Sequence, residues 1–164
     1  MNPLREAILE KLPWLITEMG FEVVSYDYSP RTFGNCRVTM DGPAFRIIFV
    51  LDRGQVLAGF TPLQDLNQHW DLSYLLEAIH GQMPSTSFDL ETIGARLRDN
   101  YSALADALGP NWDKTRAELE RRGALRLHAM QNPIRPTGTH GLWTRVLAKW
   151  LQLKYRWAGR HERG

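Results

Sequence analysis

The residue type best suited to acid–base chemistry or metal binding occurs at five scattered positions: His69, His80, His128, His140 and His161. None of them pairs with another histidine at the helical spacing of metal ligands, and the chain has no glycine-rich phosphate loop, no HExxH and no GxSxG. We interpret each histidine as a surface residue or a hydrogen-bonded structural residue. We therefore expect no metal, no cofactor and no catalytic residue, and a protein that is not an enzyme.

Two pairs of neighbouring residues are candidate contacts for a partner. Asp52 and Arg53 place opposite charges after a strand-forming run, where they could lie in a cleft. The alternative is a hairpin turn in which the aspartate caps local amides and the arginine pairs with a nearby carboxylate. Trp70 and Asp71 either form an aromatic contact point or begin a helix, with the tryptophan packed on the sheet and the carboxylate at the helix N-terminus.

The single cysteine, Cys36, excludes an intramolecular disulfide and a cysteine-rich zinc site, which favours a reducing cytoplasm. No cation or histidine adjoins it in sequence, so we expect a buried, inert thiol. The preceding Phe33-Gly34-Asn35 is either a recognition loop or a turn in which Gly34 and Asn35 supply positive φ angles.

The strongest functional signal lies near the C-terminus, where Leu142–Trp157 has the pattern of an amphipathic helix. Its candidate contacts with nucleic acid or a membrane are Trp143, Arg145, Lys149, Trp150, Arg156 and Trp157, together with Arg160. Cations of this kind contact phosphates, while tryptophans stack on bases or lie at the level of lipid headgroups. The alternative is that the apolar face docks on the body while the basic face is solvated or pairs with acidic groups.

The charge distribution separates an acidic body from a basic tail. Residues 1–110 carry 8 Lys/Arg and 14 Asp/Glu, whereas residues 111–164 carry 12 Lys/Arg and 4 Asp/Glu. The 164 residues suit one domain with a possible appendage. The N-terminus lacks a signal-peptide pattern, and no run of apolar residues is long enough to span a membrane.

The segments that must position these residues begin with a helix that Asn2 caps and Pro13 kinks or splits. Strand-forming residues then predict four strands, at Phe21–Ser29, Cys36–Met40, Phe45–Leu51 and Gln55–Phe60. Short links between them predict an antiparallel meander. Because Ile47–Leu51 is apolar at five consecutive positions, we expect a central strand covered on both faces, or nearly so.

Helical periodicity dominates the second half of the chain. It predicts helices over Trp70–His80, from a Ser87 cap to Gly109-Pro110, over Asn111–Arg122 and over Leu142–Trp157. The segment 123–130 favours neither helix nor strand. The predicted core comprises Leu12, Ile16, Val24, Val38, Ile47, Phe49, Leu57, Leu76, Ile93, Leu97 and Leu104.

We therefore predict an α+β fold with an N-terminal helix, a four-stranded antiparallel meander and a helical second half packed on the sheet. The predicted division is an α+β domain over residues 1–130, a linker over 131–141 and a basic C-terminal helix over 142–164.

Four motifs carry a resemblance over roughly the first half of the chain: Gly20-Phe21, Phe33-Gly34-Asn35, Asp52-Arg53-Gly54-Gln55 and Trp70-Asp71-Leu72. In them the chain resembles a group of small uncharacterised bacterial α+β proteins. Some of these resemble immunity proteins that neutralise polymorphic toxins. The basic segment after Gly123 departs from the pattern. The resemblance implies a protein partner and assigns no catalytic residue.

Two functions follow as expectations. The first is a non-enzymatic, immunity-like binding protein whose acidic body contacts a protein partner such as a basic toxin. The second is a nucleic-acid-associated or peripheral membrane protein that uses the basic, tryptophan-rich C-terminal helix.

Overall fold

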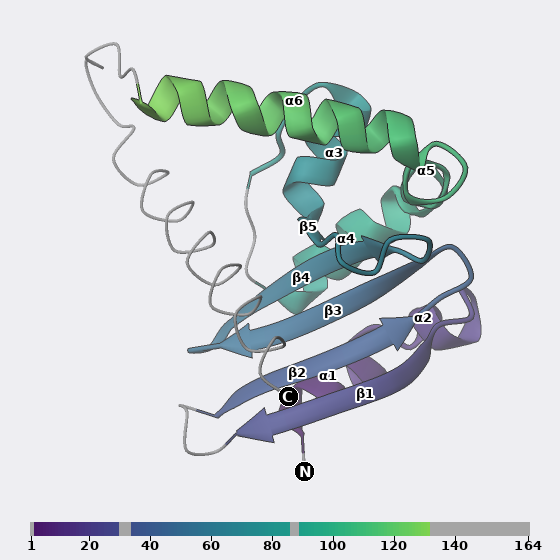
Figure 1. Cartoon of the computed structure of the whole chain (residues 1–164). Coiled ribbons are helices and arrows are strands. Elements are labelled where there is room, and N and C mark those ends of the chain that lie inside the picture. The colour runs from purple at the N-terminus through teal and green to yellow at the C-terminus, as the bar shows by residue number, and fades with distance from the viewer. Residues whose placement is uncertain (1, 30–33, 86–88, 132–164) are drawn as a thin grey trace, which may run out of the picture. The chain divides into compact units, whose positions relative to one another are not determined.

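Figure 1 shows a computed structural model of the chain, which describes residues 2–29, 34–85 and 89–131. The chain divides into two compact units, Met1–Glu120 and Arg121–Gly164. In the first unit, N-terminal helices precede an antiparallel sheet and further helices follow it. The α+β fold predicted from the sequence is therefore confirmed.

The sheet is a meander of five antiparallel strands in chain order. The strands are β1 (Glu22–Ser29), β2 (Asn35–Asp41), β3 (Phe45–Asp52), β4 (Gln55–Pro62) and β5 (Trp70–Asp71). The first four match the predicted strands. The fifth was not predicted: Trp70 and Asp71 pair with β4 across from Phe60 and Gly59, so the helix expected from Trp70 begins at Leu72.

Helices flank the sheet in the sequence. They are α1 (Pro3–Lys11), α2 (Trp14–Thr17), α3 (Leu72–His80), α4 (Leu90–Asp99), α5 (Tyr101–Leu108) and α6 (Trp112–Gln131). The Asn2 cap is confirmed, because its side chain accepts a hydrogen bond from the Arg5 amide at 3.1 Å. Pro13 separates α1 from α2, as its missing N–H and fixed φ predict.

One face of the sheet, the inner face, carries the core. Phe45, Ile47 and Phe49 of β3 are fully buried there. In Figure 1, α1 and α4 lie behind the strands; α1 packs on β2 and β3 and also contacts α4. α3 packs on β4 and α5 packs on α3. Leucines that recur at helical spacing on these helices therefore close the inner face.

An aromatic cluster joins distant segments at one end of the inner face. The ring of Phe45 lies 5.4 Å from Phe21, 5.8 Å from Phe60 and 5.7 Å from Tyr101, measured between centroids. Phe21 also meets Tyr101 edge-on, at 6.3 Å. The cluster thus links the residue before β1 to β3, β4 and α5.

Three predicted core residues lie elsewhere. Val24 is 49% exposed, because the pairing of β1 with β2 shifts register between Val23 and Ser25 and leaves Val24 at the irregularity. Ile16 is 39% exposed. Leu57 is partly exposed because the alternation of β4 places it on the face opposite the core.

The helix predicted from Ser87 to Leu108 is in fact two helices. Ser87 lies outside the described residues, and Asp89 caps α4 by accepting a hydrogen bond from the Thr92 amide at 2.7 Å. Asn100 ends α4: its side-chain amide donates to the Arg96 carbonyl at 2.8 Å, and its Oδ1 lies 2.8 Å from His80 Nε2. These contacts hold Asn100 outside helical geometry, so α5 begins anew at Tyr101.

The helix expected over Asn111–Arg122 is longer than predicted. α6 continues to Gln131, through a segment whose residue pattern favours neither helix nor strand. Trp112 and Leu119, near its start, belong to the core.

We predict that Gly94→Ala destabilises the fold while Gly123→Ala does not. A Cβ at Gly94 would lie 2.2 Å from Cδ2 of the buried Leu12, where α4 approaches the end of α1, so a loss of about 1–3 kcal/mol is expected. Gly123 is also helical but has open space where a methyl group would lie, so alanine should be neutral or stabilise by up to about 1 kcal/mol. Urea unfolding of both variants measures the difference, and equal midpoints would contradict this close packing.

Candidate protein-binding surface

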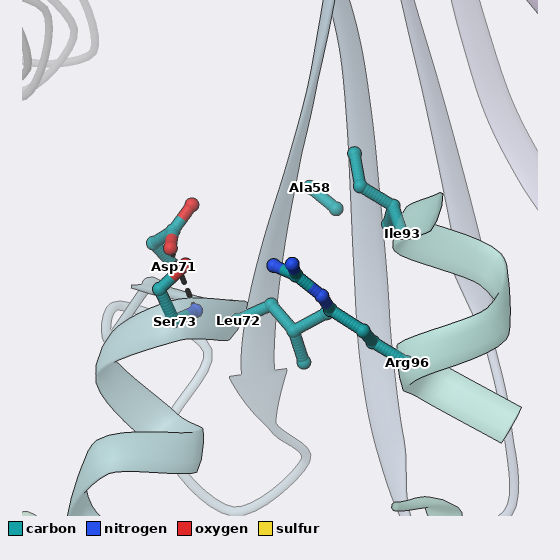
Figure 2. Close-up of a pocket in the computed structure, with 6 residues that line it drawn as sticks. All are labelled: Ala58, Asp71, Leu72, Ser73, Ile93 and Arg96. Carbon is teal, nitrogen blue, oxygen red and sulfur yellow. Dashed lines mark hydrogen bonds between the residues drawn. The ribbon is translucent and has the colours of Figure 1, made fainter. Parts of the chain in front are cut away.

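The cavity of most chemical interest lies where α3, α4 and β4 meet (Figure 2). Its lining comprises Ala58, Asp71, Leu72, Ser73, Ile93 and Arg96. Its volume of about 10 Å³ accommodates about one water molecule and no organic substrate. A carboxylate, a hydroxyl and a guanidinium therefore meet there without room for a substrate.

Asp71 performs a structural task in this cluster. It caps α3, since its Oδ1 accepts a hydrogen bond from the Ser73 amide at 2.7 Å. Burial raises the pKa of the Asp71 carboxyl, while hydrogen bonds from Ser73 and the charge of Arg96 oppose the rise. Arg96 is itself held by Ser85, donating to its carbonyl and, at 2.9 Å, to its hydroxyl.

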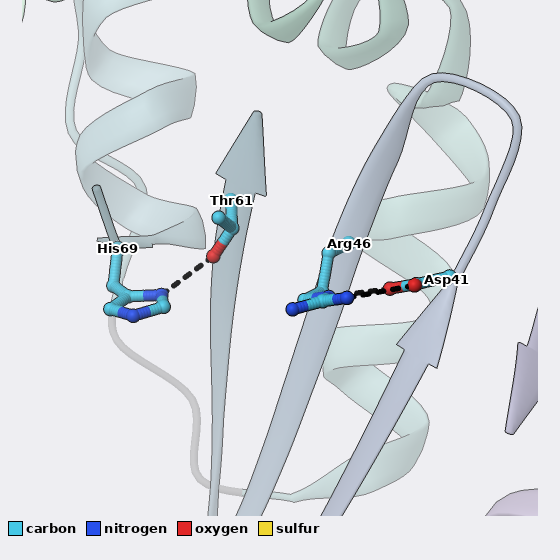
Figure 3. Close-up of polar contacts among 4 residues, drawn as sticks. All are labelled: Asp41, Arg46, Thr61 and His69. Atoms are coloured by element: carbon cyan, nitrogen blue, oxygen red, sulfur yellow. Dashed lines mark hydrogen bonds and ion pairs between the residues drawn. The ribbon is translucent and has the colours of Figure 1, made fainter. Parts of the chain in front are cut away.

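A row of polar side chains crosses the face of the sheet opposite the core, called here the outer face (Figure 3). Arg46 on β3 lies opposite Asp41 on one side and Thr61 on the other. It donates to both carboxylate oxygens of Asp41, at 2.5 and 2.8 Å. The Arg46 hydrogen bonds lower the pKa of Asp41. Thr61 Oγ1 lies 2.6 Å from Nδ1 of His69, which completes the row.

The Thr61–His69 contact resembles a nucleophile beside a base, but its burial argues against that role. Thr61 is fully buried, so a substrate cannot reach its hydroxyl. The contact instead joins β4 to the segment that leads into β5. We therefore interpret the row as a set of hydrogen bonds that join neighbouring segments of the sheet.

The β3–β4 turn is the most distinctive exposed feature of the described chain. Among the described residues, Arg53 is the one non-glycine with positive φ, at 51°, and Gly54 follows at 79°. Asn35 of β2 braces the turn: its side chain donates to Asp52 Oδ1 at 3.2 Å and accepts from the Arg53 amide at 3.4 Å. Both central residues thus adopt the left-handed geometry of a tight hairpin.

The structure separates the four predicted partner contacts. Asp52 lies opposite Gln55 at the turn, whereas Trp70 lies opposite Phe60, five residues further along β4. At a rise of about 3.4 Å per residue, these positions are roughly 17 Å apart. Trp70 packs against the core and Asp71 caps α3. Asp52 and Arg53 alone share the exposed turn.

The predictions for residues 34–36 were partly confirmed, and those for the C-terminal contacts lie outside the described residues. Cys36 is buried, as expected, and Gly34 has a φ of 71°. Asn35, expected to share that conformation, begins β2 instead. Its bracing of Arg53 was missed, because the two residues are far apart in sequence. The predicted C-terminal contacts lie outside the described residues: Trp143, Arg145, Lys149, Trp150, Arg156, Trp157 and Arg160.

The described chain holds no metal centre or membrane span. No three His, Cys, Asp or Glu side chains gather as metal ligands in residues 2–29, 34–85 and 89–131. In the same ranges, no helix has the length and apolar character needed to cross a membrane. Comparison of the chain with family models, curated proteins and solved structures found no match.

We predict opposite effects from two substitutions of Asp71. Asp71→Ala removes the cap and should cost about 1 kcal/mol. Asp71→Asn keeps a cap but removes a charge that burial disfavours, so it should stabilise the protein at pH 7. Because the folded pKa lies above the unfolded one, the stabilisation from a protonated Asp71 is complete below the unfolded pKa and is lost as the pH rises through the folded pKa.

Urea unfolding between pH 3 and pH 7 measures this linkage. The stability gained by Asp71→Asn relative to wild type should therefore grow as the pH rises. A difference that stays constant over this range would contradict the raised pKa of Asp71.

Proposed function

We propose that this chain is a non-enzymatic, immunity-like binding protein that contacts a basic protein partner through the turn at Asp52 and Arg53. The observation that carries the proposal is the strained, exposed geometry of Arg53. A non-glycine residue in the left-handed region costs about 1 kcal/mol or more, and such strain clusters at functional sites. The two hydrogen bonds of the Asn35 side chain fix the conformation of the turn, so less conformational entropy is lost when a partner binds.

Charge and shape support a protein partner. The 14 acidic against 8 basic residues in positions 1–110 attract a basic surface and raise the rate of encounter. The turn projects beyond the paired strands, whereas the described cavity holds little more than water. A bacterial cytoplasmic location, expected from the resemblance and the single cysteine, belongs to the same proposal.

Arg53→Gly provides a sharp test, because glycine adopts a positive φ without strain. Relief of the strain should offset most of what the lost Arg53 side-chain contact contributes, so this variant should stay within about 1 kcal/mol of wild type. It should nevertheless lose at least tenfold in affinity for the partner, because it removes the guanidinium N–H groups that would donate to carbonyl or carboxylate oxygens of the partner. Any loss of binding then cannot be attributed to unfolding.

The measurement combines a comparative pull-down from the native host with titration of the purified partner. Wild type and Arg53→Lys, which keeps a long side chain with hydrogen-bond donors, should retain the same basic protein. Arg98→Gln removes an exposed arginine that pairs with Glu18, and it serves as the matched control. Equal retention by Arg53→Gly and wild type would refute the proposed surface.

The basic end of α6 favours a second candidate function. Residues 121–131 carry Arg121, Arg122 and Arg126 and no acidic residue. We propose, as the alternative, that this end of the helix and the tryptophan-rich C-terminal residues contact nucleic acid or an anionic membrane surface. Arginines neutralise phosphates and release counterions, which makes such binding depend steeply on salt.

For the alternative, we predict the behaviour of a full-length variant with Arg121, Arg122 and Arg126 changed to glutamine. If all three contact phosphates, the slope of log affinity against log salt for duplex DNA should fall by about 2–3. Arg116→Gln is the control in the same helix, because it removes an arginine that lies outside residues 121–131. Fluorescence anisotropy measures the slope, and an unchanged slope in the triple variant would exclude these arginines. Binding to anionic vesicles but not to DNA would favour the membrane.

A further inference from the structure

The strand β1 forms the long edge of the sheet. Its one strand neighbour in the described chain is β2, whereas the opposite edge is the two-residue β5. Figure 1 shows β1 along the border of the sheet. An edge strand presents unpaired peptide groups that can pair with a further strand. The Asp27 carbonyl accepts a hydrogen bond from Asn2 Nδ2 at 2.9 Å, but within the described residues β1 is still the longer of the two sheet edges.

The side chains of β1 add apolar surface to this edge. Of the nine exposed large apolar side chains among the described residues, three lie on β1: Val24, Tyr26 and Tyr28, at 49%, 57% and 45% exposure. Tyr26 and Tyr28 lie opposite Val38 and Cys36, on the inner face of the sheet. Beyond the buried core, the inner face at this edge therefore carries exposed tyrosines, a residue type enriched in protein interfaces.

We propose that a second copy of this chain pairs with β1, antiparallel, about a two-fold axis at Tyr26. The two sheets then form one continuous sheet. Tyr26 lies opposite Tyr26 of the second copy, and Val24 lies opposite its Tyr28. On the other face, Ser25 lies opposite Asp27 of the second copy, where a hydroxyl can donate to a carboxylate.

The occupant is a second copy because β1 is self-complementary in this register. Opposed residues of an antiparallel pair point to the same face, so the axis must pass through a residue. An axis at Asp27 would oppose two carboxylates, which destabilises a strand pair. An axis at Ser25 would bring the irregularity at Val24 into the centre of the pairing. Of the three axes at Ser25, Tyr26 and Asp27, the one at Tyr26 therefore avoids both the irregularity at its centre and the opposed carboxylates.

The interface is small, and this sets the strength of the dimer. Pairing of seven residues or fewer buries less than the roughly 1,200 Å² of a stable interface. We therefore expect dissociation constants of about 10 µM or above. Sedimentation velocity of the wild-type chain should show a reversible dimer at a few hundred micromolar, and Tyr26→Lys, at an exposed position, should abolish it.

Two variants of the full chain, each with one introduced cysteine, test the register. The native Cys36 is buried, with 3% exposure, and contributes little background. In Tyr26→Cys, the two introduced thiols face each other at a Cα separation of about 5 Å, which a disulfide can bridge. In Asp27→Cys, they are offset by two residues and lie about 8 Å apart, beyond disulfide reach.

Under mild oxidation, Tyr26→Cys should form covalent dimers at least tenfold faster than Asp27→Cys. Equal rates, or faster linkage of Asp27→Cys, would overturn the proposed pairing, as would a wild-type chain that stays monomeric at 500 µM. Arg53→Gly should dimerise like wild type, because the turn at Asp52 and Arg53 has no part in the edge. Failure of the dimer is therefore separable from failure of the proposed partner surface.

Discussion

The aromatic contacts centred on Phe45 are the interaction on which the domain depends most. Phe45 meets Phe21, Phe60 and Tyr101 within 6 Å between centroids, and these rings come from segments far apart in sequence. Burial of each phenylalanine and the edge-on contacts of Phe21 with Phe45 and Tyr101 both stabilise the fold. Because one cluster joins the start of β1 to β3, β4 and α5, sheet and helices are expected to form together rather than as separate layers.

The helices cover the inner face of the sheet, and the cavity described beside them is small. The cavity at Asp71 and Arg96 has a volume of about 10 Å³, which leaves no room there for a small molecule. The two proposals rest on features at the borders of the sheet, namely the turn at Arg53, with its positive φ, and the tyrosine-bearing edge of β1. The two are chemically different. The turn presents a fixed charged pair, and the edge presents peptide groups beside apolar rings.

Local sequence patterns predicted the elements well where the determining contacts lie within a few residues. The Asn2 cap, the division at Pro13 and the hairpin at Asp52 all follow from short-range geometry. The predictions were wrong where a distant residue intervenes. Asn100 breaks a leucine periodicity that by itself predicts one helix, partly through a contact with His80, twenty residues earlier. Val24 fits a buried strand position by type, but the register against β2 exposes it.

The same division applies to the candidate surfaces. The sequence by itself determined that Asp52 and Arg53 form a charged turn between two strands, because turn and strand propensities act over neighbouring residues. Only the tertiary structure decided that Asn35 braces this turn, that Trp70 and Asp71 lie elsewhere, and that β1 forms the edge. Those outcomes depend on which strands pair and in which register, and pairing is set by burying the whole inner face at once.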